Sequence, residues 1–407
     1  MTPSVTLHRD LRTGTSPWFT PDAPVVPVER LAAPLRADVV VVGAGITGAL
    51  VAQALSATGH SVLVLDRRAP AHGSTAASTA LLQFEIDTPL IHLIECIGFE
   101  RARRAWLWSR CAVQDLGALI RQHDIDCAFR TRQALYLAGN VLRPGELAEE
   151  GRQRRAIGLP SAFLHAVALK ALAGIDREAA LISDGAADVD PVRLTAGLLR
   201  RSLNQGCRIF SPAELAEIVP GTRKVEMVTT DGIELAAGAV VFATGYELAK
   251  GVPTQGHAIT STWAFATPPQ PQNLWGRGEL IWEASDPYLY IRTTEDGRVI
   301  VGGEDEPISD ANERDKLLPT KIRALQAKTA QLLPRLDLTA DFAWSGAFGA
   351  SDNGLPSIGA IPGMANCYAI LGFGGNGLTF GVVASQVITS ILLGGNSAEA
   401  ELFAFGR

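Results

Sequence analysis

The sequence predicts an α/β fold, on the strength of a strand, helix, strand unit near the N-terminus and many short strands further along. Residues 38–42 form a β-branched run, which is typical of a strand buried on both faces of a parallel sheet. A glycine turn follows, then an apolar helical stretch over 46–58 and a second buried strand over 61–66. This order is one βαβ unit, and the later strands predict a second, mixed sheet.

The elements after this unit can be placed by periodicity and turn signals. Prolines at 17, 21, 24, 27 and 34 break any period over residues 1–34, which we interpret as an N-terminal arm packed on the surface. Helical character is expected over 89–124, 144–157, 310–333 and 378–393, and extended structure over 126–140, 207–243, 258–268, 280–303 and 367–371. The segment 280–303 includes a hairpin signal, with its turn at Asp296-Gly297.

Length and composition fit this architecture. The 407 residues suggest two or three domains or one large composite fold. Hydrophobic residues make up 47% and charged residues 19%, which excludes a largely disordered protein. Glycine is in excess, with 40 of 407 residues, about 10% against a usual 7%. This excess indicates many tight turns or close backbone approaches.

The charge and the cysteines narrow the class of protein. The formal net charge of −6, without a basic run, leads us to expect no nucleic-acid partner. The five cysteines contain no C-x-x-C pair, which favours free thiols in a reducing compartment. Residues 1–34 contain no signal-peptide pattern, so we expect a cytoplasmic protein. The apolar helix over 378–393 falls short of the roughly 20 residues that span a bilayer, so we expect no membrane span.

The strongest local signal is the glycine turn Gly43-Ala44-Gly45-Ile46-Thr47-Gly48, which follows a strand and opens a helix. In this pattern the first glycine makes the turn, the second lets a pyrophosphate approach the backbone, and the third allows close packing of helix and strand. The helix N-terminus adds free N–H groups and a positive dipole. Asp66, at the end of the second strand, is suited to accept hydrogen bonds from a ribose. The unit predicts a dinucleotide site, without distinguishing NAD from FAD.

Three further segments follow in order along the chain. They are 73–80 (GSTAASTA), 190–194 (DPVRL) leading to the strand 239–243 and Ala243-Thr244-Gly245, and 352–359 (DNGLPSIG) followed by 372–379 (GFGGNGLT). With the fingerprint, this ordered set resembles the FAD-dependent oxidoreductases of the D-amino acid oxidase superfamily, which includes glycine, sarcosine and γ-glutamylputrescine oxidases. The resemblance runs from about residue 37 to residue 394.

The resemblance implies an α/β fold with a discontinuous, Rossmann-like FAD-binding domain and a mixed-sheet substrate domain. The FAD-binding domain would comprise 35–88, 188–252 and 341–407, and the substrate domain 89–187 and 253–340, after the N-terminal arm 1–34. The residues that would bind FAD are Gly43, Gly45, Ile46, Thr47, Gly48, Asp66, Arg67, Arg68, Gly73, Ser74, Thr75, Ser78, Thr79, Ala80, Leu215, Ala243, Thr244, Gly245, Gly372, Gly374, Gly375, Asn376, Gly377, Leu378 and Thr379.

The glycine cluster at 372–377 also indicates a binding role on physical grounds alone. Between a strand and an apolar helix, it gathers backbone N–H groups and a helix N-terminus, which suits a ring that becomes anionic when reduced. The resemblance places it at the pyrimidine side of the flavin, although a simple turn before a core helix is the alternative. Relatives that attach FAD covalently do so through a histidine or cysteine at positions held here by Ala77 and Gly346, so we expect noncovalent FAD.

The substrate side departs from the family pattern. Members that oxidise amino acids often carry an arginine where this chain has Phe348, and that arginine would bind the substrate carboxylate. Either the substrate lacks an α-carboxylate or another cation, such as Arg292, binds it, unless Arg292 forms a hairpin salt bridge. His257 and the aromatic residues Trp263, Tyr288, Tyr290 and Trp344 could line a pocket or only pack within the sheet. The pocket candidates are therefore Tyr290, Arg292, Trp344, Phe348 and His257, with no catalytic side chain assigned.

The implied reaction is oxidation of a C–N bond of an amine or amino acid by hydride transfer to flavin N5, after which the imine hydrolyses. The hairpin 298–303 lacks the lysine that sarcosine-oxidase-like members use with oxygen, so the acceptor could be oxygen, a quinone or an electron-transfer protein. Two alternatives are an NAD-dependent dehydrogenase, which would leave the later glycine segments without a role, and a flavoprotein whose role is binding or assembly.

Overall fold

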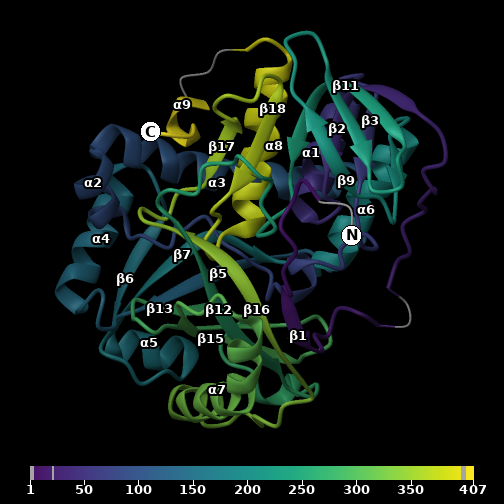
Figure 1. Ribbon diagram of the computed structural model, residues 1–407. Helices are drawn as coiled ribbons and strands as arrows, with labels where there is room; N and C mark the ends of the chain where they lie inside the picture. Colours follow the sequence, from purple (N-terminus) through teal and green to yellow (C-terminus); the bar gives the residue numbers. More distant parts are fainter. Residues whose placement is uncertain (1–3, 21–22, 396–399) are drawn as a thin grey trace.

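The strands of the chain form two sheets, one of eight strands and one of ten, within residues 4–20, 23–395 and 400–407, which the computed structural model describes (Figure 1). The α/β fold with mixed sheets that the sequence predicts is confirmed. Residues 1–3 and 21–22 of the predicted arm, and residues 396–399 near the C-terminus, lie outside the described residues.

The eight-stranded sheet carries the βαβ unit. Its central strands β18, β11, β2, β3 and β8 pair in parallel, and β17, β10 and β9 add antiparallel pairs. Helices α1, α6 and α8 pack together beside it. The bounds are β2 Leu35–Val42, α1 Ile46–Ala57, β3 Val62–Leu65, α6 Pro191–Asn204, β8 Arg208–Phe210, β9 Leu215–Val219, β10 Val225–Thr229, β11 Glu234–Phe242, β17 Ser357–Ala360, β18 Cys367–Leu371 and α8 Gly377–Leu392.

Close backbone packing fixes the turn between β2 and α1. Gly43 has φ +113°, and a Cβ there would lie 2.4 Å from the carbonyl oxygen of Ala243, at the end of β11. A Cβ on Gly48 would lie 1.9 Å from the carbonyl oxygen of Gly43. Only glycine fits either place, so this turn brings the ends of β2 and β11 and the start of α1 together.

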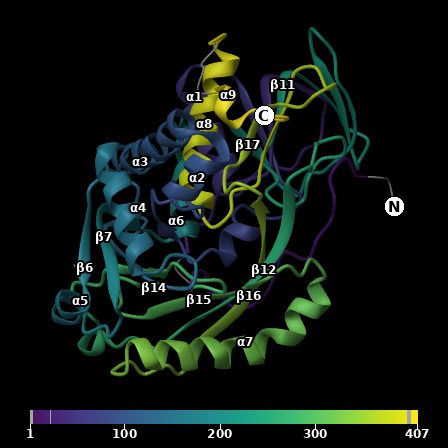
Figure 2. The same cartoon turned by 90° about the vertical axis from the view of Figure 1, so that its left-hand side faces the viewer.

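The ten-stranded sheet has the order β1-β16-β12-β15-β14-β13-β5-β7-β4, with β6 paired to β7. Figure 2 shows helix α7 (Ala311–Leu332) along one face, where it packs on β12, β15 and β16. Trp263 on β12 donates its indole N–H to the carbonyl of Arg314 in α7, so its neighbour Thr262 faces the opposite side of the sheet. The bounds are β1 Arg12–Gly14, β4 Leu81–Leu82, β5 Arg130–Leu137, β6 Ser161–His165, β7 Ala179–Asp188, β12 His257–Ala266, β13 Leu280–Glu283, β14 Leu289–Thr293, β15 Val299–Glu306 and β16 Phe342–Ser351.

The structure differs from the sequence prediction in two segments outside the βαβ unit. The helical stretch expected over 89–124 divides into α2 and α3, because Gly98 adopts φ +83° between them. Residues 158–188, for which no element was predicted, form β6, α5 and β7. The remaining bounds are α2 Leu90–Ile97, α3 Phe99–Gln122, α4 Pro144–Ala156, α5 Ala166–Ala173, α9 Ala400–Phe403, and the 3₁₀ turns η1 Ser74–Ala77 and η2 Pro271–Asn273.

Three strands cross the domain boundaries proposed from the sequence. Strands β4 and β16 come from segments proposed for the FAD-binding domain, yet both pair in the ten-stranded sheet. Strand β1 of the arm also pairs there, along β16, so this part of the arm is a sheet edge rather than a surface segment. The division into domains stays a proposal, and sheet pairing links the proposed units.

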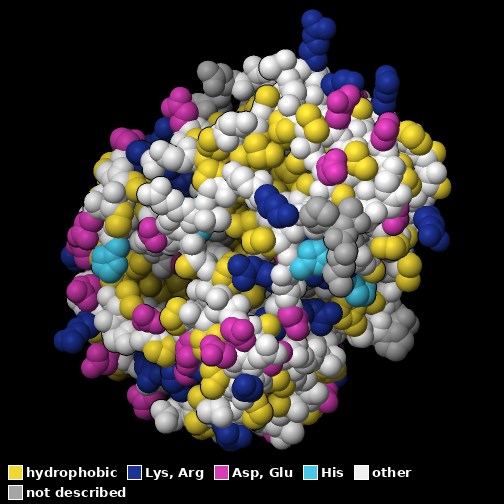
Figure 3. All heavy atoms as spheres, viewed as in Figure 1, with side chains coloured by type: hydrophobic (Ala, Val, Ile, Leu, Met, Phe, Trp, Pro, Cys, Tyr) yellow, Lys and Arg dark blue, Asp and Glu magenta, His cyan; other side chains and the backbone are white. Residues whose placement is uncertain are grey.

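The surface carries charges of both signs. On the face shown in Figure 3, Lys and Arg side chains are interspersed with Asp and Glu, so this face offers no continuous basic area. The five cysteines are free thiols, of which Cys96 and Cys111 are exposed. Within the described residues, no helix has the length and apolar character needed to cross a membrane.

Candidate active site

A pocket lies between the two sheets and is lined by residues of both. Its walls include the C-terminal ends of β2, β3 and β11, the segment after β3, and the start of α8. The ten-stranded sheet contributes Thr262, Trp282, Tyr290 and residues 346–348. Ligands of open α/β sheets bind at the carboxyl ends of the strands, and this pocket has that position.

The fingerprint turn opens into this pocket. A Cβ on Gly45 would meet only the hydroxyl of Thr75 within 4 Å, at 3.1 Å, so the backbone here is accessible from the pocket. The same hydroxyl accepts a hydrogen bond from the N–H of Ile46 at 3.0 Å. Because α1 begins at Ile46, its positive N-terminus faces the pocket beside Gly45, which is an arrangement that binds a pyrophosphate.

Asp66 lies in the pocket directly after β3. Its carboxylate accepts hydrogen bonds from the N–H groups of Ala44 at 2.7 Å and Arg68 at 2.8 Å. Burial raises the pKa of Asp66 above its usual value, and these two N–H groups only partly offset the effect. A carboxylate held by backbone at this position fits the hydroxyls of a ribose.

The basic residues that line the described pocket are Arg67 and Arg68, and both are held by acids. Arg68 donates to both carboxylate oxygens of Glu247, at 2.5 and 2.8 Å. Arg67 lies 3.4 Å from the carboxylate of Glu214. The positive charge is therefore confined to the end of the pocket next to Asp66.

The glycine cluster before α8 forms another wall. The N–H of Gly375 donates to the carboxylate of Asp87 at 2.6 Å, and the side chain of Asn376 donates to the carbonyl of Glu85 at 2.8 Å. A Cβ on Gly377 would meet nothing within 4 Å. The N-terminus of α8 is thus tied to the segment 83–87 and open to the pocket.

The segment 81–87 alternates between pocket and core. Leu81 and then the polar residues Gln83, Glu85 and Asp87 line the pocket, while Leu82, Phe84 and Ile86 between them are fully buried. This is the two-residue period of an extended chain. Sequence reasoning missed these polar residues, although the alternation was visible in the sequence.

Acidic and aromatic side chains dominate the pocket away from Asp66. Asp87 is exposed to the open pocket, and the partial loss of its hydration among the surrounding walls raises its pKa to about 6. Full burial also raises the pKa of Glu85. Tyr288, Tyr290, Trp282 and Phe348 line the same end. The hydroxyl of Tyr290 lies 3.2 Å from that of Thr262, and Tyr136 stacks on Trp282 at 3.8 Å from behind.

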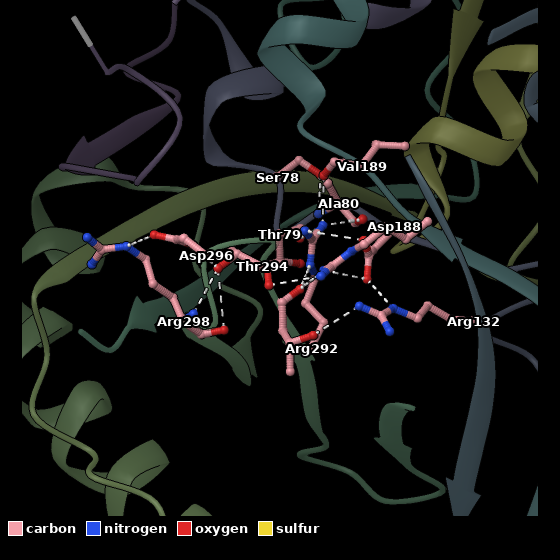
Figure 4. A network of polar contacts seen from close by, with 12 residues as sticks. Ser78, Thr79, Ala80, Arg132, Asp188, Val189, Arg292, Thr294, Asp296 and Arg298 are labelled. Carbon is pink, nitrogen blue, oxygen red and sulfur yellow. Dashed lines mark hydrogen bonds and ion pairs between the residues drawn. The ribbon is translucent and has the colours of Figure 1, made fainter. Parts of the chain in front are cut away.

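Arg292 does not reach the pocket, contrary to one of the two possibilities that the sequence left open. Its guanidinium donates to the carbonyls of Thr79, Ala80 and Val189 at 2.7–3.1 Å and lies 3.9 Å from Asp188 (Figure 4). Asp188 also binds Arg130 and Arg132. The other alternative, a salt bridge of Arg292 at the hairpin, is closer to what the structure shows. The ion pair of Arg292 is buried, however, and ties the pocket segment 78–80 to the ten-stranded sheet.

His257, Trp344 and Trp263 are likewise not brought to the pocket. The ring of His257 lies 2.9 Å from the hydroxyl of Ser357 and occupies the space that a Cβ on Gly372 would need. The indole of Trp344 donates to the carbonyl of Ala77. Trp263 faces α7. All three have packing roles, and of the five pocket candidates only Tyr290 and Phe348 line it.

Most of the residues predicted to bind the cofactor line the pocket. Those that do are Gly43, Gly45, Ile46, Thr47, Asp66, Arg67, Arg68, Gly73, Ser74, Thr75, Ser78, Thr79, Ala80, Leu215, Ala243, Thr244, Gly245, Gly374, Gly375, Asn376, Gly377 and Leu378. Gly48 lies behind Gly43, Gly372 lies against His257, and Thr379 donates its hydroxyl to the carbonyl of Gln83, so these three support the wall rather than form it.

The N-terminal arm also contributes to the pocket. Val5 and Thr6 lie in its lining near Leu215, and Leu11 lies there as well. Val5 donates its N–H to the carbonyl of Leu215, and Thr6 forms a β-bridge with Ala249. No motif in residues 1–34 signalled this role. Tyr246 and Glu247, which directly follow the Ala-Thr-Gly turn, were also missed.

Comparison with known proteins places the chain among flavoenzymes. A family model described as FAD dependent oxidoreductase matches residues 38–391. A glycine oxidase from Pseudomonas aeruginosa is 26% identical over 88% of this chain and 94% of its own length. The "Probable oxidoreductase OrdL" of Haemophilus influenzae is 22% identical over 88% of this chain and 83% of its own.

Solved structures share the fold. The glycine oxidase from Geobacillus kaustophilus has a TM-score of 0.75 and 20% identity, covering 91% of this chain and 99% of its own. The L-amino acid deaminase from Proteus myxofaciens, solved in complex with anthranilate, has a TM-score of 0.76 and 16% identity, covering 98% of both chains. The L-proline dehydrogenase from P. horikoshii has a TM-score of 0.76 and 17% identity, covering 91% of this chain and 97% of its own.

The pocket geometry predicts opposite outcomes for two glycines of the fingerprint. In Gly45→Val the new Cβ lies 3.1 Å from the hydroxyl of Thr75, which must shift by a few tenths of an ångström, and the side chain fills the pocket beside the helix N-terminus. The variant should fold yet purify without flavin colour. Gly48→Ala should instead destabilise the fold by about 3 kcal/mol, because its Cβ would overlap the carbonyl of Gly43. Absorbance at flavin wavelengths measures the bound cofactor, and urea unfolding measures the stability of each variant. A Gly45→Val protein that stays fully yellow would contradict the assignment of the pyrophosphate site.

The buried Arg292 network predicts a large loss of stability. Arg292→Gln leaves three carbonyls and Asp188 without their buried donor, so the free energy of unfolding should fall by about 3 kcal/mol. Arg298→Gln on the same hairpin is the matched control: it removes more exposed pairs with Asp296 and Asp341, worth about 1 kcal/mol. Urea unfolding compares the two variants, and a loss in Arg292→Gln of no more than about 1 kcal/mol would contradict a structural role for the buried network.

Proposed function

The chain belongs to the FAD-dependent oxidoreductase family, and from this premise we propose that it oxidises a C–N bond of an amine or amino acid. The family model covers residues 38–391, and the family binds FAD. The observation that carries the proposal is the aromatic and acidic end of the pocket, which reaches beyond the glycine cluster and is walled by Tyr288, Tyr290, Trp282 and Phe348. The named relatives include oxidases, a dehydrogenase and a deaminase of amino acids.

The residues present fit FAD. Gly45 and the start of α1 would bind the pyrophosphate, Asp66 the ribose, and the backbone of 374–377 with the start of α8 the ring. Ala77 and Gly346 offer no nucleophile for attachment, which supports noncovalent binding. When bound, FAD would accept the hydride at N5 from the carbon that carries the substrate nitrogen.

The protein would orient the substrate and manage one proton. The aromatic side chains and Phe348 form the walls against which an apolar chain packs. The carbon can release a hydride only when its amine is neutral, so a proton must leave on binding. Asp87 lies in the pocket beside Gly375, and its pKa of about 6 leaves it ionised at neutral pH. We therefore assign the carboxylate of Asp87 as the proton acceptor.

The acceptor of the electrons and the cellular location stay open predictions. The hairpin 298–303 contains no lysine, so oxygen, a quinone or an electron-transfer protein could reoxidise the cofactor. Their separate contributions can be measured once a substrate has been found. The cytoplasmic location that the sequence favours remains an expectation.

The proposed function predicts a yellow protein whose colour is bleached by its substrate class. Under anaerobic conditions, a panel of amines, amino acids and 2-hydroxy acids should give bleaching with one or more amines or amino acids and none with the 2-hydroxy acids. Readmitting air, or adding a quinone, then tests the acceptor. A colourless protein that binds NAD, or a yellow protein that no compound bleaches, would exclude C–N oxidation by this chain.

The role of Asp87 predicts a pH profile. Below pH about 6 Asp87 becomes protonated and can no longer accept the amine proton, so kcat/KM should fall as the pH is lowered through this value. Asp87→Asn should lower kcat/KM by about 100-fold and remove this acid limb. Asp115→Asn is the control, because it makes the same change at a carboxylate of α3 that accepts a hydrogen bond from Gln386 and does not line the pocket. An unchanged limb in Asp87→Asn rejects the assignment.

A further inference from the structure

A bulge in the ten-stranded sheet sets the direction of an acid behind the pocket wall. The register between β12 and β15 shifts next to Thr262, which lies opposite both Glu304 and Asp305. Glu304 has φ +59°, a left-handed conformation that few residues with a side chain adopt. The extra residue of such a bulge turns the side chain that follows it to the other face of the sheet.

The two acids of the bulge therefore face opposite sides of the sheet. Glu304 faces α7, the helix along one face of the sheet in Figure 2, where it lies 3.8 Å from Lys321 and also pairs with Lys328. Asp305 instead lies by the hydroxyls of Thr262 and Tyr288, both of which line the pocket. This acid thus stands behind the pocket wall, next to residues that form it.

Asp305 is closed to solvent. Neither of its carboxylate oxygens is accessible, and neither has a hydrogen bond of full geometry. No cation of the described residues forms an ion pair with it: Lys321, whose charge acts on it, is paired with Glu304 and Glu306. Burial raises the pKa of Asp305 to about 6, and the two neighbouring hydroxyls, as weak donors, offset part of this rise. The group is ionised at neutral pH and depends on those donors.

This carboxylate fixes the direction of the hydroxyl groups in front of it. An ionised carboxylate can only accept, so Thr262 and Tyr288 must each turn their single hydroxyl proton toward Asp305. Thr262 then has no proton for the hydroxyl of Tyr290, 3.2 Å away, and Tyr290 must be the donor of that pair. Burial raises the pKa of both tyrosines, so both keep their protons. The hydroxyl of Thr79 donates to Tyr290, which leaves the oxygen of Tyr288 freer to accept.

The tyrosines and the acid at this end of the pocket therefore all accept hydrogen bonds. Tyr288 and Tyr290 present lone pairs, and the carboxylate of Asp87 adds a negative charge. The basic residues that line the described pocket, Arg67 and Arg68, are paired with glutamates at its other end. Lone pairs and an acid attract N–H groups and repel a carboxylate.

We propose that Asp305 is a positioning residue, which makes Tyr288 accept a hydrogen bond from the amine of the substrate, and that this substrate carries no carboxylate on its reacting carbon. The inference rests on the proposed C–N oxidation and adds no step to it: the hydride still goes to the bound FAD and one amine proton to Asp87. Tyr288 accepts a second N–H of the same nitrogen, which holds the reacting carbon in place. Asp305 touches neither substrate nor cofactor and acts through this hydroxyl.

Matched pairs of amines and amino acids test the substrate class on the wild-type holoenzyme. Each pair differs only by the carboxylate on the reacting carbon: methylamine and glycine, isobutylamine and valine, phenethylamine and phenylalanine, with both enantiomers of the last two amino acids. Anaerobic flavin bleaching gives kcat/KM for reduction. We expect the best amine to exceed its matched amino acid by at least about tenfold, because the carboxylate would face acceptors only.

A variant then locates the selection. Asp305→Asn replaces an acceptor by a group that can also donate, which lets Tyr288 turn its proton to the pocket. The ratio of kcat/KM for the amine to that for its amino acid should fall by about tenfold. The fall should arise mainly from a higher KM for the amine, because Tyr288 binds the amine without reacting. The substitution keeps the size of the side chain and removes a buried charge, so we expect the variant to fold.

Two further variants serve as comparison. Glu306→Gln is the control: it makes the same change from carboxylate to amide on the same strand, at a residue that pairs with Lys321 of α7 and does not line the pocket, and it should leave the ratio as in the wild type. Tyr288→Phe removes the hydroxyl and should lower the ratio by itself. Adding Asp305→Asn to Tyr288→Phe should then change the ratio by no more than about twofold, since the two side chains act as one unit.

The outcomes separate this inference from the proposed function. Bleaching by amino acids equal to or better than bleaching by their matched amines would overturn the inference and leave C–N oxidation standing. An unchanged ratio in Asp305→Asn, or a full further change when it is added to Tyr288→Phe, would overturn the role of Asp305. If Asp305→Asn does not fold, an unchanged ratio in Tyr288→Phe overturns it instead. If no compound in the panel bleaches the flavin, both proposals fail.

Discussion

The arrangement of the site depends on one buried guanidinium. Arg292 comes from the middle of the ten-stranded sheet, and the carbonyls that it binds belong to Thr79, Ala80 and Val189, outside the hairpin. Thr79 and Ala80 also line the pocket. Carbonyls and a carboxylate deprived of this donor would be buried without a partner, so the sheet and the pocket segment are held in one relative position.

The chain separates the features that make a flavin site from those that select a substrate. Small residues at the turns and at the start of α8 let a cofactor approach backbone, and they act through the absence of side chains. Selection would depend on side chains that line the pocket: Asp87, the tyrosines and Phe348. The two sets share segment 83–87, because its carbonyls receive hydrogen bonds from α8 while its alternate side chains face the pocket.

Local signals predicted the elements that depend on adjacent residues. The unit β2-α1-β3 agrees with prediction to within a few residues, because buried β-branched runs and a glycine turn act over short distances. The direction of Arg292 could not be predicted, since it depends on carbonyls more than 100 positions away in the chain. For the same reason, the sequence alone could not predict that β1 pairs with β16 or that Val5 and Thr6 line the pocket. Glu85 and Asp87 could have been found, because the alternation with Phe84 and Ile86 is local.

The arm has a consequence for how the protein matures. The pocket joins Val5 and Thr6 to Gly377 and Leu378, so its lining spans almost the whole order of synthesis. A ribosome-bound chain would expose the fingerprint early, yet the wall that α8 supplies would still be missing. High-affinity cofactor uptake should therefore follow synthesis and packing of α8. The bound cofactor then stabilises the native state by mass action, so that colour would report that the arm and α8 have both reached their places in the fold.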